Sequence, residues 1–174
     1  MDFNFLFYLL FLTIVAVVAI VMLMLKKQAQ VELLKLKNEI NIQKQTYFLP
    51  SKLEAYQRCI LLLDRISPAN LTLRTLNINQ TARAQQSVLI KTVRDEYEHN
   101  IAQQLFISEE GWQILVHAKE EVLRVINLAA NSLNKDATAT ELATKILEIT
   151  AKIDPFPTEI CRAFLQKEFR DFYA

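Results

Sequence analysis

Residues 3–25 read FNFLFYLLFLTIVAVVAIVMLML, and the only polar side chains in this run belong to Asn4, Tyr8 and Thr13. As an α-helix, a run of about 23 residues extends roughly 34 Å, which exceeds the bilayer hydrocarbon thickness of about 30 Å. An apolar run of this length that is polar on no face is typical of a helix surrounded by lipid. The sequence therefore predicts a transmembrane anchor over residues 1–27.

A cleaved signal peptide and a buried core helix are the two alternatives for this run. A signal peptide needs a basic start, an apolar core of about 7–15 residues and a cleavage site of small residues. The chain instead begins with Asp2 and no basic residue, and the run ends in Met24 and Leu25. We therefore expect the run to remain attached as an anchor.

Basic residues flank the run on one side only. Lys26 and Lys27 follow it directly, Lys35 and Lys37 come a few residues later, and no basic residue precedes it. Because positive charge marks the cytoplasmic side of a membrane helix, this asymmetry predicts an outside N-terminus and a cytoplasmic C-terminal domain.

The composition of the whole chain limits the classes of function. Lys and Arg number 20 and Asp and Glu 19, a balance that argues against a dedicated nucleic-acid binder. Gly111 is the only glycine, which argues against strand-rich folds and against phosphate-binding loops. Cys59 and Cys161 form no Cys-x-x-Cys pair, so we expect free thiols, no zinc site and no cofactor.

Residues 28–49, which we call the stalk, continue from the apolar run without a helix breaker. Apolar residues recur along the stalk at three- and four-residue steps, at Ala29, Leu33, Leu36, Ile40 and Tyr47. So narrow a stripe suits a coiled-coil seam, but Gln43 interrupts it and it is shorter than three or four heptads. Self-association and packing against the chain's own domain both fit this pattern.

We call residues 50–174 the bundle, because their sequence pattern predicts about five antiparallel helices packed together. The expected fold class is therefore all-α. Pro50 is expected to end the stalk, and Ser51 and Glu54 to form a capping box for the next helix. Ser108 is an expected N-cap, and Thr138 is expected to begin a second capping box. Apolar periodicity places the helices at about 52–66, 80–106, 109–133, 138–153 and from about 157 to 172.

Glu96 and His99 form a Glu-x-x-His motif, the ligand spacing of carboxylate-bridged di-iron bundles. Such sites need a second copy of the Glu-x-x-His motif. The residue three positions before the other histidine, His117, is Ile114 rather than a glutamate, so the second copy is absent. A metal-dependent or other enzyme built from Glu96, His99 and His117 is therefore kept as an alternative to a solvated polar face. We expect no enzyme, because two histidines and one glycine form no recognisable catalytic constellation.

Lys119 falls on the apolar face of its predicted helix, among Trp112 and Leu123. A buried lysine is costly unless it is paired. The pattern predicts a buried polar contact from Lys119 to Glu96 or Asn100 on the preceding helix. The alternative is that Lys119 extends along apolar surface to reach water.

Three segments carry a resemblance to known proteins. They are SKLEAYQRCILLLDRISPANL at 51–71, RDEYEHNIAQQLFIS at 94–108 and AKEEVLRVINLAA at 118–130. The chain resembles an uncharacterised family of bacterial proteins that have one N-terminal membrane helix followed by a helical domain. The resemblance implies a bacterial source, and hence the inner membrane, but it implies no activity.

The expected function is that of an interaction or scaffold protein at the membrane surface. The expected partners are the lipid bilayer and either a second copy of the chain or another protein. We expect no binding of nucleic acid. A third alternative is an accessory subunit of a membrane complex. The scaffold interpretation predicts apolar surface left exposed along the stalk or the C-terminal helix.

Overall fold

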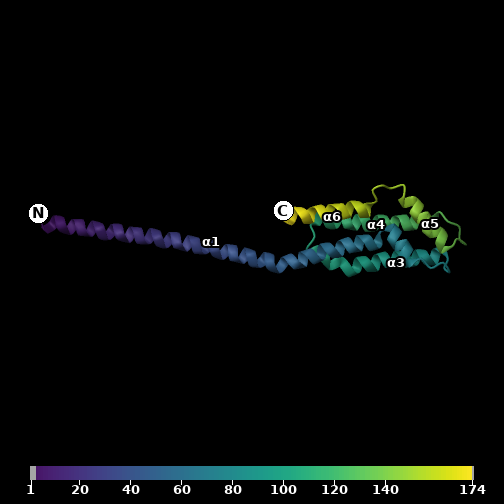
Figure 1. Cartoon of the computed structure of the whole chain (residues 1–174), viewed down its shortest axis with the longest axis horizontal. Coiled ribbons are helices and arrows are strands. Elements are labelled where there is room, and N and C mark those ends of the chain that lie inside the picture. The colour runs from purple at the N-terminus through teal and green to yellow at the C-terminus, as the bar shows by residue number, and fades with distance from the viewer. Residues whose placement is uncertain (1–2, 174) are drawn as a thin grey trace. The chain divides into compact units, whose positions relative to one another are not determined.

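The computed structural model describes the backbone of residues 3–173, in two compact units that are each described separately below, residues 1–49 and 50–174 (Figure 1). The side chains it describes exclude those of residues 1–11, 13, 15, 16, 18, 19, 41, 44, 45, 173 and 174. The predicted anchor over residues 1–27 includes residues 1 and 2, which are not among the described residues.

All regular elements of the described chain are helices, which confirms the all-α fold class. The order is α1 (Phe3–Ile66), α2 (Pro68–Thr75), α3 (Ala82–Asn100), η1 (Ile101–Leu105), α4 (Glu109–Asn131), α5 (Ala139–Thr150) and α6 (Pro157–Tyr173). The segment η1 is a 3₁₀-helix.

The described residues include no helix with an apolar segment of the length that a bilayer crossing demands. This finding contradicts the predicted transmembrane anchor over residues 1–27, and with it the predicted inner-membrane location and the orientation predicted for that anchor. A crossing takes about 20 consecutive, predominantly apolar residues. From Lys26 onward, the helix α1 carries charged side chains regularly, and charged side chains are costly within a bilayer.

Pro50 does not end a helix, contrary to the sequence-based prediction, because it lies inside α1. A proline within a helix cannot donate one backbone hydrogen bond, which weakens the helix locally without preventing its continuation. Since no helix begins at Ser51, the predicted capping box does not form there. Glu54 instead forms an ion pair with Arg58, one turn later, at an N···O distance of 2.8 Å.

The bundle has one hydrophobic core, with α4 at its centre. Figure 1 shows α4 alongside α6, and α4 also packs against α3 and α5. Large apolar side chains from every α-helix of the bundle are almost completely buried in this core: Leu62, Leu63, Ile66, Leu71, Leu89, Leu115, Ile126, Leu142, Ile146 and Leu165. Removing these side chains from water is the main stabilising contribution to such a domain.

Two predicted helix caps are confirmed. The hydroxyl of Ser108 accepts a hydrogen bond from the Gly111 amide at 2.9 Å, at the start of α4. Thr138 and Glu141 form the predicted capping box: the Thr138 hydroxyl accepts from the Glu141 amide at 3.3 Å, and the Glu141 carboxylate accepts from the Thr138 amide at 2.7 Å. Each cap satisfies backbone N–H groups that have no partner within the helix.

The starts of α3 and α5 are joined by an isolated β-bridge between Thr81 and Thr138, which the sequence did not predict. The Ala82 amide donates to the Ala137 carbonyl at 2.8 Å, and the Ala139 amide donates to the Gln80 carbonyl at 3.0 Å. These bonds connect two segments that are far apart in the sequence, so no local pattern could reveal them.

The helix predicted over residues 80–106 is shorter, because α3 ends at Asn100 and η1 follows. The Asn100 backbone leaves the α-helical region at φ −110° and ψ 3°, while its side-chain amide donates to the Glu96 carbonyl at 2.8 Å. An asparagine side chain that bonds to the backbone in this way competes with helix continuation. As a result, Ile101 and Leu105 are exposed rather than part of the core stripe.

Gln85 is expected to stabilise the connection between α2 and α3. It is buried, and its side-chain amide donates to the Thr75 carbonyl at 3.0 Å and accepts from the Asn77 amide at 3.3 Å. Gln85→Leu would leave these buried groups unpaired and lower the free energy of unfolding by about 1–3 kcal/mol. Urea denaturation followed by fluorescence of Trp112, the single tryptophan, measures this loss. The same change at the exposed Gln113 is the control, and equal effects at the two positions would contradict the assignment.

Candidate functional site

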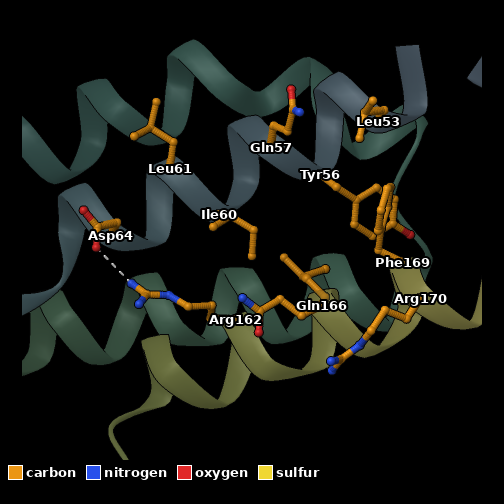
Figure 2. A pocket seen from close by; sticks show the side chains of 11 residues that line it. Leu53, Tyr56, Gln57, Ile60, Leu61, Asp64, Arg162, Gln166, Phe169 and Arg170 are labelled. Carbon is orange, nitrogen blue, oxygen red and sulfur yellow. Dashed lines mark hydrogen bonds and ion pairs between the residues drawn. The ribbon is translucent and has the colours of Figure 1, made fainter. Parts of the chain in front are cut away.

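An open groove of about 730 Å³ lies between the part of α1 that belongs to the bundle and α6 (Figure 2). The first wall comes from α1, with Leu53, Tyr56, Gln57, Ile60, Leu61 and Asp64, and the second from α6, with Arg162, Leu165, Gln166, Phe169 and Arg170. We call this feature the α1–α6 groove.

Helical spacing explains why these side chains share one groove. Residues three, four or seven apart lie on the same helix face, and Leu53, Ile60 and Asp64 follow this spacing along α1. Leu53 and Leu61 are 38% and 54% exposed, although both are leucines beside a hydrophobic core. The groove therefore presents apolar side chains that the bundle itself leaves in water.

Tyr56 is the best-fixed residue of the groove. Its ring packs on Phe169 with centroids 5.3 Å apart, and its hydroxyl donates to Glu168 at 2.7 Å. Burial, together with the hydrogen bond to this carboxylate, raises the Tyr56 pKa above its ordinary value. The same Glu168 oxygen accepts from the Ser108 amide at 3.3 Å, so Glu168 connects α1 and α6 to the start of α4.

Gly111 makes room for this connection. A Cβ atom at Gly111 would lie 2.9 Å from a Glu168 carboxylate oxygen and 3.0 Å from a Leu165 methyl carbon. The single glycine of the chain thus allows α4 and α6 to approach closely, which is a packing role.

The two ends of the groove differ in charge. At one end, Arg162 donates to Asp64 at 3.1 Å, as the dashed line in Figure 2 shows. At the other end, Arg170 is exposed and has no ion pair among the described residues. Lys52 is near this second end, with its ammonium 3.4 Å from the Phe172 ring centroid and 6.0 Å from that of Tyr56. The second end is therefore basic.

A second, polar pocket of about 390 Å³ lies between α1 and α3 and contains Glu96 and His99. Glu96 pairs with Arg65 at 3.0 Å and with Arg74 at 3.3 Å, and its side chain is 14% exposed. Arg74 also donates to the Arg65 carbonyl at 3.2 Å. The carboxylate of Glu96 is thus engaged by two guanidinium groups that join α1, α2 and α3.

The structure does not bring Glu96, His99 and His117 together as metal ligands. His99 is exposed, with Nδ1 2.7 Å from the Asp95 carbonyl oxygen, and His117 lies exposed on α4. Across the described residues, no three His, Cys, Asp or Glu side chains are close enough to share a metal ion.

Lys119 has other partners than the predicted Glu96 or Asn100. Its ammonium lies 2.7 Å from the Glu120 carboxylate and 4.3 Å from the centroid of the Tyr97 ring. Tyr97, rather than Glu96, faces α4, where it packs on Trp112 with ring centroids 5.7 Å apart. An aromatic face attracts a lysine ammonium, so Lys119 is partly buried and still has favourable contacts.

The groove residues were not predicted as a site. The available signal is that apolar residues of the helix predicted at 52–66 cover a broad arc, which predicts neighbours on more than one side. Part of that arc faces the core, and part of it, at Leu53 and Leu61, lines the groove. A sequence pattern alone does not distinguish an apolar face covered by the same chain from one left open.

No curated protein and no solved structure gave a match to this chain. Residues 3–172, almost the whole chain, match the family of unknown function DUF7935. The chain therefore belongs to the DUF7935 family.

Proposed function

We propose that this chain is a protein-interaction scaffold whose α1–α6 groove binds an amphipathic helix of a partner protein. The observation that carries the proposal is the open groove of about 730 Å³, with leucine and aromatic side chains along its walls. Exposed apolar side chains gathered in one concave place are typical of binding sites.

The dimensions of the groove define its occupant. From Leu53 to Asp64, α1 rises roughly 17 Å, so a partner helix of about three turns would fill the groove. Such a helix would present aliphatic residues at positions i, i+3 or i+4, and i+7. Its acidic residues would lie at the end where Lys52 and Arg170 make the groove basic.

Binding of a synthetic peptide tests the groove. The probe is a fluorescent peptide of about four helical turns, with leucines on one face and two glutamates at one end. We expect its anisotropy to rise with full-length protein. Leu61→Arg should weaken binding at least tenfold, because it places a charge in the apolar wall. Leu128→Arg, at a leucine 49% exposed on α4 and outside the groove, is the matched control and should change little.

Charge reversal tests the orientation of the partner helix. Arg170→Glu should weaken binding of the peptide with glutamates and strengthen binding of a peptide with lysines at the same end. If the glutamate peptide does not bind, or if Leu61→Arg and Leu128→Arg weaken it equally, the groove is not the docking surface.

A further inference from the structure

We infer that the stalk pairs with the stalk of a second copy of this chain as a parallel two-stranded coiled coil. This inference concerns the first unit of the chain and is independent of the proposed function of the α1–α6 groove.

The stalk carries a seam of exposed apolar side chains. With Leu33 at heptad position a, Leu36 falls at d, Ile40 at a and Tyr47 at a, while Ala29 falls at the preceding d. Leu33 and Leu36 are each 56% exposed, Ile40 44% and Tyr47 79%. A lone helix with such a stripe leaves its apolar surface in water, and pairing with another helix removes that surface from water.

The charges beside the seam match those of a second copy. In this register Glu32 and Glu39 occupy g positions and Lys37 occupies an e position. In a parallel pair, a g residue lies next to the e residue five positions later on the other chain. Glu32 of one copy would therefore pair with Lys37 of the other, twice in each dimer, and the sequence repeats this spacing at Glu39 and Lys44.

The same charges disfavour an antiparallel pair. Antiparallel helices place g positions opposite g positions and e opposite e, so glutamates would face glutamates and lysines would face lysines. Glu32, Lys37 and Glu39 are exposed and form no ion pair within the described chain. Their charges are therefore available to a partner, and their arrangement selects the parallel orientation.

Polar residues within the seam fix the register. Gln43 occupies a d position of the stalk, and Lys26 occupies the a position just before the stalk begins. A polar residue in the seam reduces stability but penalises every register that buries it against apolar side chains. The pair formed by the stalk alone should therefore be specific in register and modest in affinity.

Disulfide crosslinking of the full-length protein tests orientation and register. We expect Ala29→Cys and Leu36→Cys, both at d positions, to give disulfide-linked dimers on mild oxidation, because a parallel in-register pair brings each cysteine next to its copy. No antiparallel pair can do so at both positions. Asn38→Cys, at an outward f position, is the matched control and should remain largely monomeric. The native Cys59 and Cys161 are buried and do not interfere.

Charge variants in the Leu36→Cys background test the pairing of Glu32 with Lys37. Glu32→Lys or Lys37→Glu alone should weaken dimerisation about fivefold, since each places like charges at two sites per dimer. The double exchange Glu32→Lys/Lys37→Glu should restore it. Absence of crosslinks at Leu36→Cys, equal crosslinking of Asn38→Cys, or failure of the double exchange would overturn the inference. Peptide binding by the groove should be unchanged in all these variants, so the two hypotheses can fail separately.

Discussion

Leu115→Ala is expected to lower the free energy of unfolding of the bundle by about 2–5 kcal/mol. Leu115 is completely buried on α4, the helix that packs against α3, α5 and α6. Truncation removes apolar contacts and leaves a cavity that neighbouring helices can only partly fill. Urea denaturation followed by Trp112 fluorescence measures the change, and because Trp112 lies in the bundle, the signal reports this unit rather than the stalk.

The matched control for this prediction is Leu128→Ala on the same helix. Leu128 is 49% exposed, so the same chemical change creates no cavity and should alter the free energy of unfolding by only about 0.5 kcal/mol. Similar losses at Leu115 and Leu128 would contradict the placement of α4 at the centre of the core.

Raising the pH above about 9 is expected to destabilise the bundle steeply. Cys59 and Cys161 are completely buried, and burial raises the pKa of each thiol from an ordinary value of 9.0 to about 12. Between these two values the unfolded chain releases thiol protons that the folded chain retains, so stability falls as the pH rises. Each thiol can contribute up to about 1.4 kcal/mol per pH unit. Tyr56, whose pKa is also raised, adds to the fall above about pH 10.

Removing the thiols separates their contribution from that of other groups. A double variant, Cys59→Ala with Cys161→Ala, should be less stable than the parent at neutral pH, because alanine fills the core less well. Its stability should nevertheless fall less steeply with pH. Urea midpoints measured at about pH 8, 9 and 10 compare the two proteins. Parallel declines would show that the buried thiols do not govern the alkaline transition.

The two proposed binding surfaces belong to different units of the chain. The α1–α6 groove is an open apolar site with one basic end, whereas the stalk carries an apolar seam bordered by alternating charges. Their chemistry favours different partners, a foreign amphipathic helix for the groove and a second copy for the stalk. A protein with both properties would hold two copies of a partner together.

Predictions from local sequence patterns succeeded where the decisive interactions are themselves local. The caps at Ser108 and Thr138 formed as expected, because each involves residues three positions apart. The prediction at Pro50 failed because a proline weakens a helix without necessarily ending it. The predicted membrane anchor over residues 1–27 was contradicted, since the described residues include no helix that meets the requirement for a bilayer crossing.

Helical periodicity and capping depend on neighbours along the chain, so the all-helical fold and the starts of most helices of the bundle can be predicted from local sequence. The groups that meet across helices depend instead on how the helices pack: Glu96 with Arg65 and Arg74, Lys119 with Tyr97, and Tyr56 with Glu168. The groove between α1 and α6 likewise results from helix packing. Helical spacing specifies which side chains share a face, whereas the packing of whole helices specifies what that face meets.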